Sequence, residues 1–178
     1  MLPYRTISWT YNTSVPAPSN RPLGERTNFL LSQLGFHTAA RFTDRLASLG
    51  IQPSHFGLLM HLAQGEGRTQ QQLAEALGIH RKVMVGLLDD LEQRGLAERR
   101  RHPADRRAHA IHLTDAARAL LPEAVAIADA EEEELLTGLD GGERRQLLAL
   151  LQRLAEHSGY PRGVHPGLRR SSGPHGMG

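Results

Sequence analysis

The sequence predicts a mainly α-helical protein built around a winged helix-turn-helix, with long helices at both ends. Three observations support this fold class. Apolar residues recur at helical spacing through most of residues 25–157. Two short helical segments, at about 69–77 and 81–94, are joined by a turn at Gly78. Directly after them, between residues 96 and 113, the pattern changes to the partial alternation of a two-strand β wing.

The first three helices have recognisable boundaries. A stripe of leucines predicts a helix over residues 27–48, and Gly50 ends it. Pro53 suits the first turn of a second helix. Thr69 is a good N-cap for the third helix, which leads into the turn at Gly78.

The remaining elements follow in order. A fourth helix is expected over residues 81–94, and strands are expected near 96–99 and 108–113. Thr114 can cap a fifth helix over residues 115–139. Asp140, with Glu143 three residues later, resembles the capping box of a sixth helix that ends at His157.

The composition divides the chain into a folded body and two irregular ends. Residues 1–24 are rich in Pro, Ser, Thr and Asn and predict an irregular arm. Residues 158–178 are rich in Gly, Pro and Arg, and we expect a disordered tail that adds nothing to a core. The body spans residues 25–157, and its helix-turn-helix lobe spans about 53–114.

Composition also excludes several classes of protein. The chain has no cysteine, so disulfides, cysteine-containing zinc sites and thiol catalysis are ruled out. No apolar run approaches the ~18 residues of a membrane span. The first residues lack the apolar region of a secretory signal, so a cytoplasmic protein is expected. No phosphate-cradling glycine loop, paired carboxylates or nucleophile with a base predicts an enzyme or a bound cofactor.

Arginine is concentrated where the wing is expected. Of the 21 basic residues 20 are arginine, and residues 99–107 hold five arginines against one aspartate. The simplest alternative is a solvated hairpin, but the position after two short helices favours double-stranded DNA as a partner. The fourth helix can enter a major groove, and arginines of the wing can enter the adjacent minor groove.

The stretch from Leu73 to Thr114 is similar to the MarR (multiple antibiotic resistance regulator) family of bacterial transcription factors. The most specific match is to the family's wing signature, an Asp-x-Arg followed by a closing Leu-Thr. The matching residues are Asp105, Arg106, Arg107, Ala108, Ile111, Leu113 and Thr114. The resemblance covers roughly residues 25–157 and leaves both ends of the chain outside it.

This resemblance implies an obligate homodimer that binds a pseudopalindromic operator, most simply as a repressor. The helices at 27–48 and 115–157 would form the dimer interface, and residues 81–94 would form the recognition helix. Arg107 would enter the minor groove, and Asp105 would steady the wing. Many members release DNA when a small anionic or phenolic ligand binds between the dimer helices and the DNA-binding lobe.

The recognition helix departs from the family pattern at three positions. His80 stands where a Ser or Asp cap is common, and Gly86 where Arg is common. Asp90 replaces a common basic residue, and we expect it to face the phosphates. Base contacts therefore fall on Arg81, Lys82 and Val85. The full set expected to contact DNA or shape the contact is Arg81, Lys82, Val85, Arg99, Arg100, Arg101, Asp105, Arg106 and Arg107. The departures keep a second hypothesis open, a dimeric winged-helix module for protein contacts with weak or non-specific DNA binding.

Two further groups of residues invite functional hypotheses. His37 and Arg41 lie one helical turn apart and are candidates for an effector cleft, although intersubunit or surface contacts explain them equally well. The histidines lack the i, i+4 spacing of a helical zinc site, so no metal site is predicted. The run of glutamates at 131–134 is interpreted as a solvated face rather than a cation site.

Overall fold

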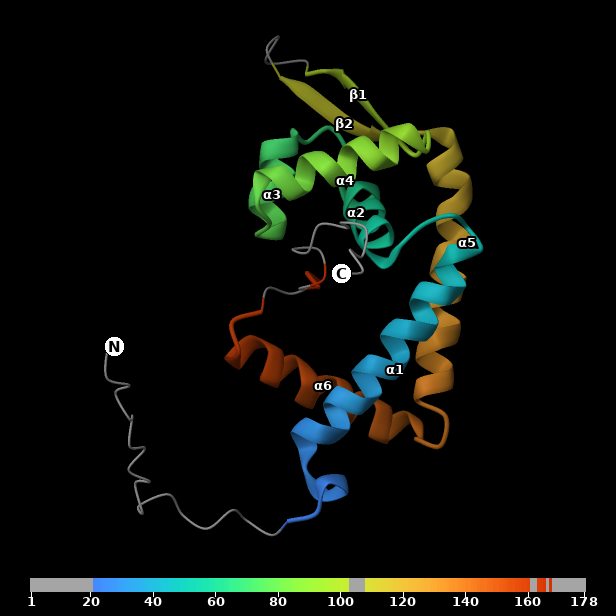
Figure 1. Ribbon diagram of the computed structural model, residues 1–178, viewed down its shortest axis with the longest axis vertical. Helices are drawn as coiled ribbons and strands as arrows, with labels where there is room; N and C mark the ends of the chain where they lie inside the picture. The colour runs from blue at the N-terminus through green and yellow to red at the C-terminus, as the bar shows by residue number, and fades with distance from the viewer. Residues whose placement is uncertain (1–20, 103–107, 161–162, 166, 168–178) are drawn as a thin grey trace, which may run out of the picture. The chain divides into compact units, whose positions relative to one another are not determined.

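The computed structural model describes residues 21–102, 108–160, 163–165 and 167 (Figure 1). These ranges contain six α-helices and one two-stranded antiparallel sheet, which confirms the predicted fold class. The elements are α1 (Thr27–Ala47), α2 (Pro53–Gln64), α3 (Gln70–Leu77), α4 (Arg81–Gln93), β1 (Ala97–Arg101), β2 (His109–Leu113), α5 (Asp115–Leu135) and α6 (Gly141–His157). No described helix has the length and hydropathy of a membrane span.

The chain divides into two compact units, residues 1–36 and 37–178. The described part of the first unit is a single 3-10 turn, Leu23–Glu25, followed by the start of α1. This stretch of α1 exposes a series of large apolar side chains, namely Phe29, Leu30, Leu31, Leu34 and Phe36. The second unit contains the rest of α1 and all later elements.

Local signals in the sequence set the helix boundaries. Thr69 accepts a hydrogen bond from the backbone of Gln72, whose side chain in turn accepts one from Thr69 N–H, at 2.8 Å. Gly78 adopts a left-handed conformation with φ of 58° and so allows the sharp turn into α4. Asp140 and Glu143 form the predicted capping box of α6.

The fifth helix is shorter than predicted. It ends at Leu135 rather than near residue 139. Gly138, with φ of 97°, lies in the left-handed region and turns the chain toward the cap of α6. Periodicity alone could not place this end, because leucines continue through Leu136 and Leu139 in the turn.

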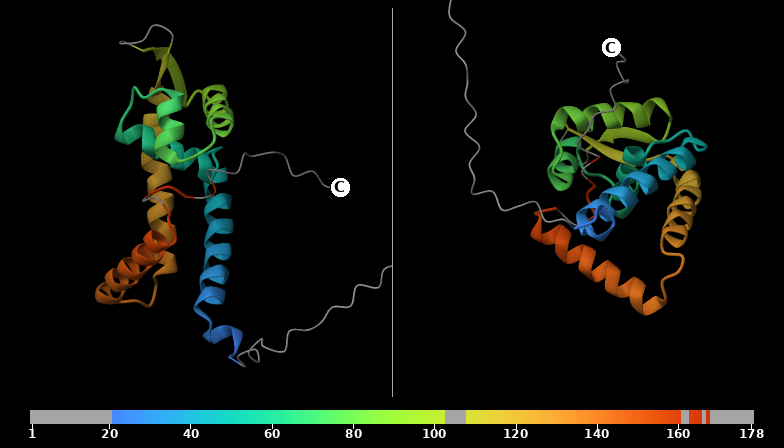
Figure 2. Two further views of the ribbon diagram at one scale, coloured as in Figure 1. Left: turned by 90° about the vertical axis from the view of Figure 1, so that its left-hand side faces the viewer. Right: turned by 60° about the horizontal axis from the view of Figure 1, so that its bottom comes forward.

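The wing is fixed to the helix-turn-helix at its base. In β1 and β2, Arg99 is paired with Ile111 and Arg101 with His109. Ile111 also donates a backbone hydrogen bond to the carbonyl of Arg68, at 2.9 Å, so the loop between α2 and α3 extends the sheet. Figure 2 shows the hairpin beside α3 and α4. The wing tip, including Asp105, Arg106 and Arg107, lies outside the described residues.

The core of the lobe is built from aliphatic side chains, as the low aromatic content predicts. The largest fully buried apolar side chains are Leu46, Leu58, Leu59, Leu62, Leu73, Leu77, Met84, Leu88, Leu91, Ile111 and Leu113. They come from the end of α1, from α2 to α4 and from β2. Phe42 and Phe56 pack edge to face at their margin, with ring centroids 5.5 Å apart.

Part of the C-terminal tail joins this core. Val164 is 9% exposed and packs with the core residues, and the carbonyl of Gly163 lies 3.1 Å from Nε2 of His61 on α2. We expected no core contribution from residues 158–178. A composition rich in Gly, Pro and Arg did not show that a single valine among them would be buried.

Candidate nucleic-acid interface

The start of α4 presents two basic side chains. Arg81 and Lys82 are exposed, and Val85 is half-buried one turn later. His80 caps this end, because its Nδ1 accepts a hydrogen bond from the backbone N–H of Lys82 at 3.1 Å. Histidine therefore caps α4 in place of the Ser or Asp that is common at this position. The helix end that would enter a major groove is well formed.

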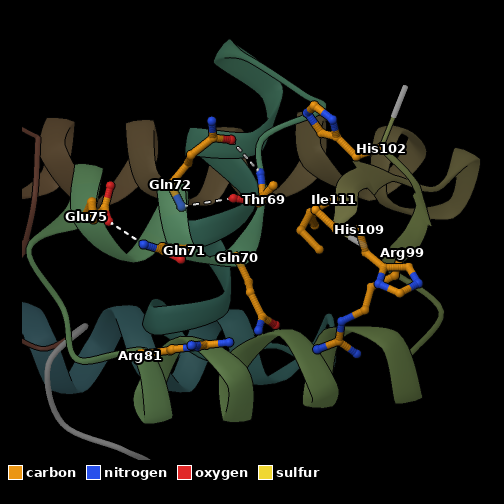
Figure 3. A pocket seen from close by; sticks show the side chains of 11 residues that line it. Thr69, Gln70, Gln71, Gln72, Glu75, Arg81, Arg99, His102, His109 and Ile111 are labelled. Atoms are coloured by element: carbon orange, nitrogen blue, oxygen red, sulfur yellow. Dashed lines mark hydrogen bonds between the residues drawn. The ribbon is translucent and has the colours of Figure 1, made fainter. Parts of the chain in front are cut away.

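A hollow of about 560 Å³ lies between the start of α3, the start of α4 and the outer half of the wing strands. Figure 3 shows Gln70 and Arg81 on the helix side of this hollow and His102 and His109 on the wing side. Amide and basic side chains of this kind donate hydrogen bonds to phosphate oxygens. The hollow thus brings together donors from three elements, of which the sequence analysis had named only Arg81 and Arg99.

Arg99 does not extend freely from the wing. Its guanidinium lies 2.6 Å from Oδ1 of Asp89 and is also paired with Glu92, both on α4. The side chain is 25% exposed. A phosphate contact from Arg99, as expected from the sequence, would compete with these two ion pairs. In this structure Arg99 joins the wing to the recognition helix.

The other basic residues of β1 are more open. Arg100 is paired with Glu98 on the same strand, and its side chain is 59% exposed. An exposed pair of this kind contributes only about 0–1 kcal/mol to folding, so Arg100 can exchange its partner at little cost. Arg101 is exposed at the end of the strand. Both remain available for a polyanion.

Asp90 has two partners within the lobe, and the expectation that it faces phosphates stays a prediction. Its Oδ2 lies 2.8 Å from Nε2 of His55, and its Oδ1 accepts a hydrogen bond from Nε of Arg94 at 3.0 Å. The carboxylate is therefore held between a side chain of α2 and Arg94, the residue that caps the end of α4. Gly86 is exposed, and a Cβ added there would meet no atom within 4 Å, so packing does not require glycine at this position.

His55 is fully buried, and its surroundings shift its titration. Burial lowers the pKa of His55 below its usual value, because desolvation disfavours the charged ring. Asp90 opposes this shift and Arg94 adds to it. The ring is therefore neutral near pH 7. A neutral ring can accept a hydrogen bond at one nitrogen and donate at the other.

A second polar cluster connects the wing to α5. Glu66, in the loop after α2, lies 3.1 Å from Nδ1 of His112 on β2 and is paired with Arg118 on α5. Burial alone would raise the pKa of Glu66, but hydrogen bonds from His112 and Arg118 outweigh it, so the pKa is lowered. In its charged form Glu66 thus joins the loop after α2 to β2 and to α5.

The glutamates of α5 are not all solvated, which corrects the sequence interpretation. Glu131 is 8% exposed, and its carboxylate lies 2.6 Å from Nε of Arg45 and 3.4 Å from Nε of Arg41. Glu134 is paired with the same two arginines. Burying a carboxylate requires such partners. Arg41, a candidate for effector binding, is thus already paired, while His37 one turn earlier is exposed.

Several of these residues were missed in the sequence. The i, i+4 pair of Asp90 and Arg94 was visible, as was the equal spacing of Arg41 and Arg45 on one helical face. The histidine partner of Asp90 and the loop carboxylate Glu66 gave no local signal. Among the described residues, no group of three or more histidine and acidic side chains is placed to hold a metal ion.

Comparison with known proteins places this arrangement in a family. A model of the MarR family matches residues 49–108. The transcriptional repressor CouR bound to a 23-mer DNA duplex is 37% identical, over 76% of this chain and 94% of that chain, with a TM-score of 0.64.

Two further structures show similar agreement. CouR from Rhodococcus jostii RHA1 bound to p-coumaroyl-CoA is 30% identical over 76% of this chain and 95% of that chain, with a TM-score of 0.64. A probable transcriptional regulator from Pseudomonas aeruginosa is 28% identical over 75% of this chain and 99% of that chain, with a TM-score of 0.65. The chain belongs to the MarR family of DNA-binding, winged helix-turn-helix transcriptional regulators.

Proposed function

We propose that the protein is a cytoplasmic, non-enzymatic repressor that binds a pseudopalindromic operator as a homodimer. The observation that carries this proposal is the exposed, capped start of α4, with Arg81 and Lys82 beside a hollow lined by wing residues. The likeness to a DNA-bound repressor at 37% identity supports it. The lobe at about 53–114 would contact DNA, and the helices at 27–48 and 115–157 would form the dimer.

The proposal assigns separate roles to the basic residues. Arg81 and Lys82 read base edges in the major groove, and Val85 contacts a thymine methyl. Arg100, Arg101 and Arg106 contact phosphates, which position the protein without reading sequence. Arg107 enters the minor groove, and Asp105 steadies the tip. Arg99 contributes mainly by holding the wing against α4.

Exposed apolar surface on α6 supports the dimer. No residue described for this helix is buried in the single chain. Its exposed leucines are Leu148, Leu150, Leu151 and Leu154. Contiguous apolar surface of this kind marks an association site. A second copy of the chain, with the same helix, would cover it.

The proposal includes release by a small anionic or phenolic effector. CouR, which is 30% identical, has been solved with p-coumaroyl-CoA. In the present chain, Arg41 and Arg45 face Glu131 and Glu134 in a cluster between α1 and α5. An anionic ligand would compete with these carboxylates for the guanidinium groups. His37 is placed one turn from Arg41 to contact the same ligand.

The function is tested by fluorescence anisotropy of the purified protein across a salt series. The probes are a duplex selected from a random pool on this protein and a scrambled duplex of equal composition. We expect tighter binding to the selected duplex, with an affinity that falls steeply as salt rises. Equal, weak binding to both duplexes would contradict the proposal and favour a protein-interaction module.

Arg100→Ala is expected to weaken binding to both duplexes to a similar extent. A phosphate contact adds to affinity by releasing counterions, so its loss should reduce the slope of log K against log salt by about one unit per protomer. Arg145→Ala, an exposed arginine of α6, serves as a control and should keep the wild-type slope. An unchanged slope for Arg100→Ala would remove this residue from the phosphate contacts.

A further inference from the structure

A chain of polar contacts ties the recognition helix to the turn between α1 and α2. The guanidinium of Arg94 donates to the carbonyl of Gly50 and, through Nε, to Oδ1 of Asp90 at 3.0 Å. Oδ2 of Asp90 lies 2.8 Å from Nε2 of His55. Nδ1 of His55 accepts a hydrogen bond from the backbone N–H of Gln52 at 3.2 Å. Together with the backbone from Gly50 to Gln52, these contacts form a closed loop, which we call the α4 latch.

The latch determines which nitrogen of His55 carries the proton. Because Nδ1 accepts from Gln52 N–H, the neutral ring carries its hydrogen on Nε2, and this nitrogen lies 2.8 Å from Oδ2 of Asp90 without a well-aligned hydrogen bond. The ring is 0% exposed, so in the folded protein its nitrogens depend on protein groups rather than on water. Asp90 is the charged group that lies within contact distance of this buried nitrogen, and its attraction offsets part of the cost of burying the ring. The carboxylate also sets the position of Arg94.

The latch acts at the end of α4 that does not touch DNA in the proposed complex. Asp90 follows Arg81 by nine residues, which corresponds to about 13 Å along the helix. A small tilt at Asp90 therefore becomes a displacement of the side chains that read bases. A base contact tolerates little displacement, because its hydrogen bonds need donor–acceptor distances of about 2.7–3.2 Å.

We propose that His55, Asp90 and Arg94 are positioning residues that hold α4 in the orientation needed to read sequence, an inference that rests on the proposed function. Asp90 stands at a position where a basic residue would add a phosphate contact. In this chain the residue at that position orients α4 and does not add positive charge for a phosphate. The latch also joins α4 to Gly50, three residues after the end of α1. Arg94 thus connects the recognition helix directly to the turn that follows α1.

The test measures the affinity of Asp90→Ala for the selected and the scrambled duplex. The two possible roles of Asp90, in the latch or facing phosphates, predict opposite changes in affinity for the selected duplex. If Asp90 faced phosphates, Asp90→Ala would remove a repulsion and strengthen binding to every duplex. If it belongs to the latch, Asp90→Ala should weaken binding to the selected duplex by about tenfold, the equivalent of one misplaced base contact. Binding to the scrambled duplex should stay unchanged, since it depends on phosphate charge. Arg94→Gln should act in the same direction.

Three further measurements distinguish a change in the orientation of α4 from a change in net charge or in the stability of the fold. Glu25→Gln removes an exposed carboxylate before α1 and should leave the ratio of the two affinities unchanged. Asp90→Asn keeps an acceptor for the imidazole and should recover part of the lost ratio. Circular dichroism and thermal unfolding select a temperature at which every variant is folded. Stronger or unaltered binding of Asp90→Ala to the selected duplex would overturn the proposal.

A second measurement requires no variant. Nitrogen chemical shifts of the His55 ring should show the neutral form protonated at Nε2 near pH 7. Protonation at Nδ1 would overturn the latch, because that nitrogen could no longer accept from Gln52 N–H. A wild-type protein that failed to distinguish the two duplexes would instead contradict the proposed function, so the two failures are distinguishable.

Discussion

Replacing Leu151 and Leu154 of α6 by glutamate is expected to convert the proposed dimer into a monomer. Both side chains are exposed in the single chain, at 38% and 51%, and α6 buries none of its described residues. A dimer that covered them would bury apolar surface worth about 25 cal/mol per Å². Two glutamates in each copy would place four carboxylates in that interface without partners. Light scattering or sedimentation gives the oligomeric state directly.

The same variant should lose affinity for a two-half-site operator by about a hundredfold or more, because each lobe would then bind its half-site without the effective concentration supplied by its partner. Gln152→Glu adds charge to the same helix and is the control, with an expected dimer. Circular dichroism establishes that the lobe remains folded. If the leucine variant stayed dimeric with wild-type affinity, α6 would not form the interface.

Arg107→Ala is expected to reduce operator affinity by about 1–3 kcal/mol, the usual loss for a contact that reads DNA. The register of β1 and β2 supports this expectation, because His102 N–H donates to the carbonyl of Ala108 and closes the paired strands there. Arg107 falls between these two residues in the sequence. Arginine is favoured in a narrow minor groove by its negative potential.

The measurement compares duplexes that share half-sites and differ in the flanking minor groove. Arg107→Ala should lose most affinity for the A·T-rich flank, where the groove is narrow. Arg107→Lys keeps the positive charge, so its affinity should depend on salt as the wild-type affinity does. It should recover only part of the preference for the A·T-rich flank. Wild-type affinity of Arg107→Ala for both flanks would contradict the assignment of the wing.

The fold was largely predictable because its boundaries have local causes. Thr69, Gly78 and Asp140 act on residues within three or four positions, so their effects are visible in sequence. The end of α5 was misplaced because apolar residues continue into the turn. The burial of Val164 was missed because one side chain in a polar tail carries no periodic signal.

The site was only partly predictable, since its ion pairs join distant parts of the chain. Arg41 and Glu131 are 90 positions apart, and no local pattern connects them. Asp90 was assigned to the DNA face by its position on α4, but its partner His55 lies on another helix. Charge in the sequence indicated where basic residues concentrate. Which of them already have a partner, as Arg99 does, depends on tertiary packing.

The recognition helix also carries the protein's one lysine side-chain amine. Lys82 is the sole lysine in the 178 residues, and it is exposed at the capped start of α4. Side-chain acylation of this protein therefore falls on the surface that would face the bases. Acetylation there would remove a positive charge and change a strong donor into a neutral amide. A fluorophore attached through the same amine would report occupancy of that surface from a single defined position.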